Sequence, residues 1–117
     1  MLVVPLFAAW LLIQSPHFEL ATDTDEKSGR QVLAELENAR IALAGPYGTP
    51  LPIRCFLFRR ETEFAAYRPT PITRAFFQSG PDRDYIVAAL NSDGKIPREN
   101  LIHEYVHLYL HHHSRPN

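Results

Sequence analysis

Residues 103–107 read His-Glu-Tyr-Val-His, which is an H-E-x-x-H pattern. Two histidines four residues apart lie on the same face of a helix, where both imidazoles can bind one Zn²⁺ at about 2.0–2.1 Å. Glu104 is rotated by about 100° from His103 on such a helix, so it is placed to take a proton from a water molecule that the metal makes more acidic. The pattern predicts that His103 and His107 are metal ligands, that Glu104 is the catalytic base, and that the cofactor is Zn²⁺.

The motif is specific for a chain of this size. With 6 histidines in 117 residues, about 0.02 accidental matches are expected from the composition. The alternative is an amphipathic helix whose histidines are ordinary surface or core residues. The surrounding sequence favours the zinc site, because apolar residues near the motif can bury the rest of the helix: Leu101, Ile102, Val106, Leu108 and Leu110. Pro97 suits the first turn of this helix.

Two histidines do not complete a zinc site, and a third histidine lies close in the sequence. His113 stands at the last position of an H-E-x-x-H-x-x-G-x-x-H pattern, with Leu110 in place of the glycine. On a continuous helix His113 would lie about 15 Å along the axis from His103. A left-handed backbone at Leu110 would cost about 1–2 kcal/mol, which is small beside a metal-binding energy on the order of 10 kcal/mol. His113 as third ligand therefore stays open, beside a solvated helix end for residues 111–113.

Composition describes an ordinary globular chain. The net charge is −1, 45% of residues are hydrophobic and 21% are charged, which is enough for one core. No basic block and no alternation of basic and aromatic residues is present, so nothing indicates a nucleic-acid partner. The single cysteine, Cys55, lies in an apolar run and cannot form an internal disulfide, so we interpret it as a small buried hydrophobic residue.

The first residues form an uncharged apolar run over positions 2–13. This run is too short to span a bilayer and has the length of the apolar part of a signal peptide. No Lys or Arg precedes it and no good cleavage site follows, so a buried terminal strand or helix is the alternative. We predict a signal peptide or apolar N-terminal segment over residues 1–15, no stable membrane span, and a secreted or periplasmic protein.

The remaining sequence alternates strands with helices. Strands are expected at residues 18–22, 53–58, 73–78 and 84–90, the last two as an antiparallel hairpin. A helix should begin at a cap formed by Thr22, Asp23 or Thr24 and run through Ala44, with Gly29 weakening it slightly. Its buried stripe is Val32, Leu33, Leu36, Ala39, Ile41 and Leu43.

A turn at residues 45–50 should follow this helix, and a short helix should span residues 61–67 with Phe64 and Tyr67 facing inward. The order of elements implies an α+β domain with a mixed sheet and packed helices.

A loose pattern of aromatic residues around the motif resembles the gluzincin-type zinc metallopeptidases, specifically the peptidase MA-like family of secreted bacterial proteins. The residues that carry it are His17-Phe18-Glu19-Leu20, Phe56-Leu57-Phe58, Phe64-Ala65-Ala66-Tyr67, Phe76-Phe77 and His103-Glu104-Tyr105-Val106-His107-Leu108. The resemblance implies the front half of a zincin (thermolysin-like) catalytic domain, a peptide or protein substrate, and a cleft-bordering strand whose free edge can pair with an extended peptide.

The resemblance also implies a third zinc ligand from a glutamate on a following helix, but no acidic residue follows Glu104. Residues 16–117 are therefore expected to be an incomplete metallopeptidase domain, a fragment that lacks its third ligand. Two functions stay open: a zinc-dependent hydrolase, most plainly a peptidase, and a non-catalytic remnant or binding module of the same fold. The sequence leaves the oligomeric state unknown.

Overall fold

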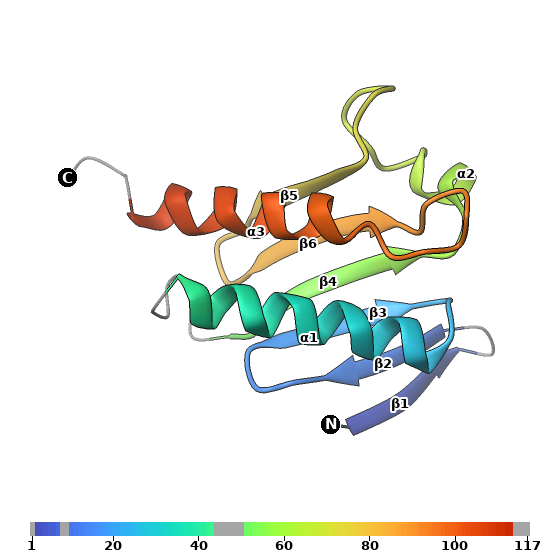
Figure 1. The fold of residues 1–117 in the computed structure, drawn as a ribbon, viewed down its shortest axis with the longest axis horizontal. Coiled ribbons are helices and arrows are strands. Elements are labelled where there is room, and N and C mark those ends of the chain that lie inside the picture. Colours follow the sequence, from blue (N-terminus) through green and yellow to red (C-terminus); the bar gives the residue numbers. More distant parts are fainter. Residues whose placement is uncertain (1, 8–9, 44–50, 114–117) are drawn as a thin grey trace.

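The computed structural model describes residues 2–7, 10–43 and 51–113 (Figure 1). In this part of the chain six strands form one mixed sheet in the order β1-β2-β3-β4-β6-β5. The elements are β1 (Leu2–Phe7), β2 (Trp10–Gln14), β3 (Phe18–Thr22), α1 (Glu26–Ala42), β4 (Ile53–Phe58), α2 (Glu61–Phe64), β5 (Ala75–Ser79), β6 (Asp84–Ala89) and α3 (Arg98–His113). The expected α+β class is confirmed.

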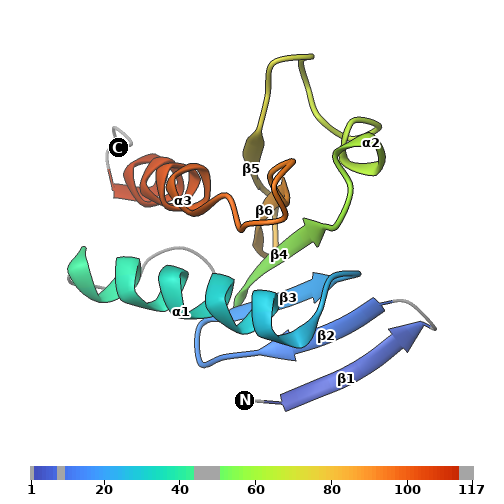
Figure 2. The same ribbon diagram turned by 45° about the vertical axis from the view of Figure 1, so that its right-hand side comes forward.

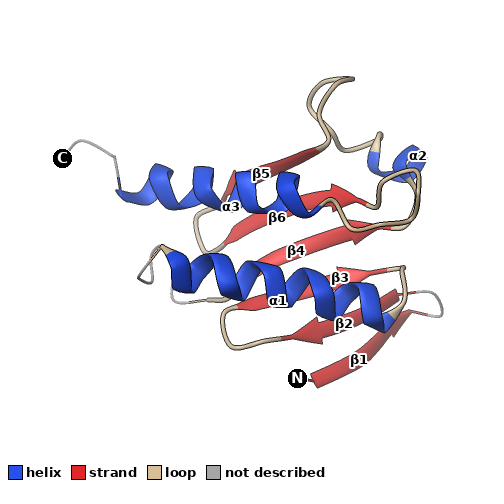
Figure 3. Cartoon of the chain, viewed as in Figure 1, coloured by secondary structure: helices blue, strands red, loops and turns tan. Residues whose placement is uncertain are grey.

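The sheet combines two antiparallel ends with a parallel centre (Figure 3). Strands β1, β2 and β3 pair antiparallel, β3 pairs parallel with β4, and β4 pairs parallel with β6. The expected hairpin is confirmed, because β5 and β6 pair antiparallel, with Ala75 opposite Ala88 and Ser79 opposite Asp84. Strand β5 stands at one edge, beside the helix that carries the motif.

Helices α1 and α3 lie side by side on one face of the sheet (Figure 2). Alternate residues of the strands point to this face, so the main core lies between the sheet and the two helices. It includes Ile13, Phe18, Leu20, Val32, Leu33, Leu36, Cys55, Leu57, Ile86, Leu101, Tyr105 and Leu108. Cys55 is buried as expected, and burial raises the pKa of its thiol far above the ordinary value. Within the described residues, none of the helices is long and apolar enough to cross a bilayer.

The expected cap of α1 is wrong. The side chain of Asp25 is the cap, accepting a hydrogen bond of 2.7 Å from the backbone amide of Ser28. The earlier candidates have other partners, because the Thr22 hydroxyl donates to the Leu57 carbonyl oxygen at 2.8 Å and the Asp23 carboxylate accepts from the Arg59 amide at 2.7 Å. Both side chains are therefore engaged with β4 and the residue after it, and the helix begins one residue after Asp25.

The buried stripe of α1 is confirmed for Val32, Leu33 and Leu36, but Ile41 is 70% exposed because it lies about 140° around the helix axis from Leu36. The predicted continuation to Ala44 and the turn at residues 45–50 lie outside the described residues, apart from the observed end of α1 at Ala42.

Gly29 packs directly against side chains of β2 and β3. A Cβ atom at this position would lie 2.5 Å from Cδ1 of Ile13 and 3.2 Å from Cδ2 of Leu20. Glycine therefore lets the helix pack against β2 and β3, and its role is more than the slight weakening of the helix that the sequence predicts. The contact also places Ile13, from the apolar N-terminal run, inside the core. Residues 2–7 and 10–14 are strands here, and their removal as a signal peptide stays a prediction.

The opposite face of the sheet carries aromatic residues. Phe58, Phe64, Val87 and Ala89 form a second buried cluster, with Trp10, Phe56 and Phe76 packed against it. A hollow of about 650 Å³ lies on this face between Trp10, Phe56, Tyr67 and Tyr85. Phe64 is buried as expected, but the expectation for Tyr67 is wrong: α2 ends at Phe64, and Tyr67 is 64% exposed while one ring face stacks on Phe58.

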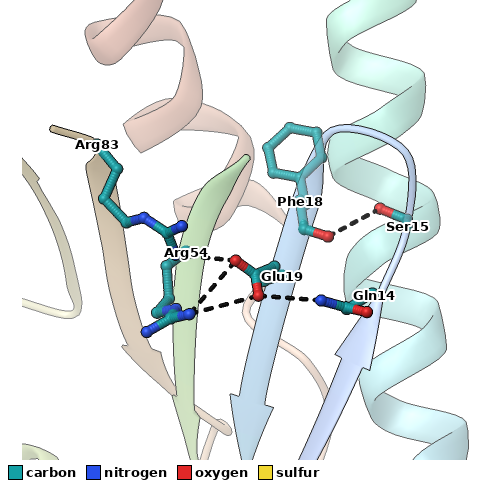
Figure 4. A network of polar contacts seen from close by, with 6 residues as sticks. All are labelled: Gln14, Ser15, Phe18, Glu19, Arg54 and Arg83. Atoms are coloured by element: carbon teal, nitrogen blue, oxygen red, sulfur yellow. Dashed lines mark hydrogen bonds and ion pairs between the residues drawn. The ribbon is translucent and has the colours of Figure 1, made fainter. Parts of the chain in front are cut away.

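A network of polar side chains around Glu19 lies at the other end of this face (Figure 4). The carboxylate of Glu19 is nearly buried and accepts hydrogen bonds from Gln14 at 3.1 Å, from Arg54 at 3.4 Å and from Arg83 at 2.8 Å. Burial alone raises the pKa of Glu19, but the hydrogen bonds and the two guanidinium charges outweigh it, so that its pKa lies below the ordinary value. The network joins β2, β3, β4 and Arg83, the residue just before β6.

Candidate metal and catalytic site

Helix α3 positions the motif by burying Tyr105, the middle residue between the two histidines. The backbone amide of Leu101 bonds to the Pro97 carbonyl oxygen at 2.9 Å, so Pro97 begins the helical turn as predicted. Tyr105 lies two residues from each motif histidine, about 200° around the helix axis. Tyr105 is 0% exposed and its ring packs edge-on against Phe18. Its burial therefore aims His103 and His107 away from the core.

The two histidines meet on the exposed side of the helix. Their Nε2 atoms are 2.9 Å apart, with ring centroids 4.3 Å apart and the rings at 71°. One nitrogen donates to the other, and the tautomers decide which. Two nitrogens bound to one tetrahedral Zn²⁺ are about 3.3 Å apart, so a small rotation of the rings would accommodate the ion. The expectation that the two rings share one face of a helix is confirmed, but their nitrogens are in hydrogen-bond contact and no metal-sized gap separates them.

Glu104 lies half-buried between the helix and β5. Burial raises the pKa of its carboxyl above the ordinary value, and the charges of His103 and His107 and a hydrogen bond from the Phe77 backbone amide offset only part of the increase. A carboxylate with a raised pKa is a stronger proton acceptor near neutral pH. The residue expected to be the base therefore lies beside both expected ligands, in a setting that strengthens it as a base.

A pocket of about 400 Å³ opens beside the motif. Its walls include His103 and Glu104 from α3 and Ile72, Arg74 and Ala75 from the segment that leads into β5. The expected base and one expected ligand thus line the same open space, at the edge of the sheet where β5 has no neighbouring strand among those described.

Within residues 2–7, 10–43 and 51–113, no third ligand approaches this pair. Helix α3 is continuous through Leu110 to the end of the described chain, so the bend needed by the H-E-x-x-H-x-x-G-x-x-H pattern is not formed. The His113 ring stacks on Tyr109 and its Nδ1 lies 3.0 Å from the Tyr109 carbonyl oxygen. Leu110, expected to be buried, is 48% exposed. Among the described residues no group of three or more His, Cys, Asp or Glu side chains could hold a metal ion.

The other histidines of the run have different neighbours. His112 Nε2 lies 2.9 Å from a carboxylate oxygen of Asp84, a buried residue that also accepts a 2.8 Å hydrogen bond from the Ser79 hydroxyl. The His111 ring packs against Phe77, with centroids 6.2 Å apart. Asp84 and His112 therefore attach the end of α3 to β6, which favours a structural role for part of the histidine run.

Sequence reasoning missed the contributions of Tyr105 and Phe77. Tyr105 occupies a position where the motif accepts any residue, and only its spacing from the histidines could have indicated that it faces the core. Phe77 is one of two adjacent aromatic residues in a predicted strand, and nothing in the sequence shows that its ring stacks on His107, at a centroid distance of 6.2 Å and an angle of 12°.

The chain was compared with protein families and with curated proteins, and neither comparison identifies a relative. No family model matches it, and no curated protein gives a significant match.

Proposed function

We propose that this chain carries the catalytic helix and edge strand of a zinc-dependent hydrolase of the gluzincin kind, acting on peptides. The observation that supports the proposal most directly is the convergence of the His103 and His107 Nε2 atoms at 2.9 Å beside the half-buried Glu104. Two imidazoles and an adjacent carboxylate with a raised pKa are the groups that metal-assisted hydrolysis needs. When bound, Zn²⁺ supplies a Lewis acid that polarises a carbonyl group and acidifies water.

The residues of the chain have separate roles in this proposal. His103 and His107 would hold the metal through their Nε2 atoms, and Glu104 would accept the proton from a water molecule that the metal makes more acidic. Strand β5 offers a free edge next to the pocket, where an extended peptide can add as a further strand through main-chain hydrogen bonds. The zincin resemblance of the sequence agrees with an edge strand that is antiparallel to its neighbour and runs beside the motif helix.

A second candidate function has its own support. Because no third ligand approaches the pair within the described residues, the chain itself is expected to hold Zn²⁺ more weakly than a three-ligand site. Such a chain can be a metal-binding module of the same fold that does not turn over substrate. Both functions use the histidine pair. They differ in whether a water molecule reacts with a substrate and gives its proton to Glu104.

A Zn²⁺ titration of the full chain tests the pair. We expect measurable binding that is lost in His103→Ala and in His107→Ala and kept in Glu104→Gln and in the matched control His113→Ala. Binding that is unchanged without either motif histidine would refute the metal site.

Peptide hydrolysis, measured with a mixture of fluorogenic peptides at saturating Zn²⁺, separates the two functions. Hydrolysis that Glu104→Gln abolishes while metal binding persists supports the hydrolase. Binding through the pair with no hydrolysis favours the binding module. Hydrolysis that persists in Glu104→Gln would show that the base lies elsewhere.

A further inference from the structure

Phe77 lies next to an expected metal ligand, His107, and the expected base, Glu104, of the candidate site. It lies in the middle of β5, and its ring stacks on the His107 ring at 12° with centroids 6.2 Å apart. The His111 ring also packs against Phe77. The centroids of these two rings are 6.2 Å apart and their planes meet at 53°. The backbone amide of the same residue lies on the edge of β5 near the Glu104 carboxylate, where it helps to lower the pKa of that carboxyl. One residue thus touches an expected metal ligand with its side chain and the expected base with its main chain.

We propose that Phe77 is a positioning residue that orients His107 through its ring and Glu104 through its amide. This inference rests on the proposed function, since it assigns the roles of ligand and base to those two residues. Phe77 carries no group that would bind the metal, so its role toward the metal is indirect.

The ring contact matters because His107 is exposed. An exposed imidazole samples several rotations about its side-chain bonds, and only some of them point Nε2 at the position shared with His103. A flat aromatic ring packed parallel to the imidazole restricts these rotations, as the hydrogen-bonded partners of metal-binding histidines do in other sites. An aliphatic side chain of similar size would fill the space without favouring one plane.

The amide contact depends on the place of β5 in the sheet. Successive amides of a strand point alternately to its two sides, and β5 pairs only with β6 among the described strands. The amide of Phe77 is directed to the side away from β6. The Glu104 carboxylate lies on that side, and the amide lowers its pKa. The amide of Ser79, two residues further, faces the same side and serves as a matched control.

The first test measures Zn²⁺ affinity in the full chain. Phe77→Leu keeps the apolar volume and removes the flat ring, and Phe77→Tyr keeps the ring. We expect Phe77→Leu to weaken binding about three- to tenfold, the range that ring stacking contributes, and Phe77→Tyr to bind within about twofold of the wild type. Equal affinity of wild type and Phe77→Leu, or equal weakening in both variants, overturns the role of the ring.

The second test measures amide hydrogen exchange by NMR in the metal-free chain, and it does not depend on how the Phe77 variants fold. Glu104→Ala should speed exchange of the Phe77 amide about three- to tenfold and leave the Ser79 amide unchanged. An unchanged Phe77 rate overturns the role of the amide.

Failure of the positioning role is distinguishable from failure of the proposed function. If the wild type binds Zn²⁺ and His103→Ala abolishes the binding, the metal site stands and the Phe77 variants decide the positioning role. If the wild type shows no binding that depends on the pair, the proposed function fails and the positioning role fails with it.

Discussion

Replacing Gly29 by alanine sets two effects against each other, and the structure allows both to be weighed. Alanine is favoured over glycine in a helix by about 0.8–1.0 kcal/mol. The added Cβ atom would lie 2.5 Å from Cδ1 of Ile13 and 3.2 Å from Cδ2 of Leu20, both fully buried, and overpacking of this kind costs about 1–3 kcal/mol. Because Cδ1 is the end of a flexible side chain, we take a cost near 2 kcal/mol. Gly29→Ala should therefore lower the free energy of unfolding by about 1 kcal/mol.

The same substitution should reverse its sign when the obstructing methyl group is removed. Ile13→Val deletes Cδ1 and by itself costs about 0.5–1.5 kcal/mol. In that background Gly29→Ala should raise the free energy of unfolding by about 0.5–1 kcal/mol, because the helix preference remains and the main clash is gone. The two substitutions should then be coupled by about 1.5–2 kcal/mol.

Urea denaturation followed by circular dichroism measures all four members of the cycle, provided that the dependence on urea stays the same in each. Asn38→Ala, at an exposed position of the same helix, is the control: it should give the same small gain with isoleucine or valine at position 13. A stabilising Gly29→Ala in the wild type, or equal effects in the two backgrounds, would refute the packing of β2 against α1 and with it the place of the N-terminal segment in the fold.

Three further results are expected. Glu37 accepts hydrogen bonds from Ser15 at 2.6 Å and from the His17 amide at 2.9 Å; burial raises its pKa, but these bonds outweigh burial and lower it. Glu37→Gln should therefore destabilise the protein by about 1 kcal/mol at pH 7, and urea titrations should show the difference from wild type shrinking as the pH falls below 4.5. Cys55 should react with a thiol reagent only after denaturation, as absorbance at successive urea concentrations would show. His113→Ala should leave Zn²⁺ affinity unchanged, and a large loss by titration would instead support a bend at Leu110.

The sequence predicts the central strands because their apolar residues alternate or run continuously. Residues 18–22 and 53–58 coincide with β3 and β4, and the predicted strand at residues 84–90 coincides with β6 to within one residue. The histidine pair is equally accessible to sequence reasoning, because the spacing of four residues fixes a shared helix face. Local patterns determine these features, so no knowledge of distant neighbours is needed.

Features that depend on residues far apart in the chain could not be predicted in this way. The cap of α1 is Asp25 because Thr22 and Asp23 bond to residues at the end of β4 and just after it. The amide of Phe77 reaches Glu104 only because α3 packs beside β5. Each of these two contacts depends on a partner residue that the local helix or strand pattern cannot identify.

The edge contact between the Phe18 and Tyr105 rings has a consequence for how the chain folds. It joins the third strand to the last helix, and the same core contains Ile13 near one end of the sequence and Leu108 near the other. A nascent chain in which α3 has not yet been synthesised lacks these partners. The apolar side of the early strands that will face the helices is then exposed to solvent. Contacts of such large sequence separation slow folding, because a long loop must close before they form. We expect folding to become cooperative only when the motif helix has been synthesised, so that the segment with the proposed metal ligands is also the segment that completes the core.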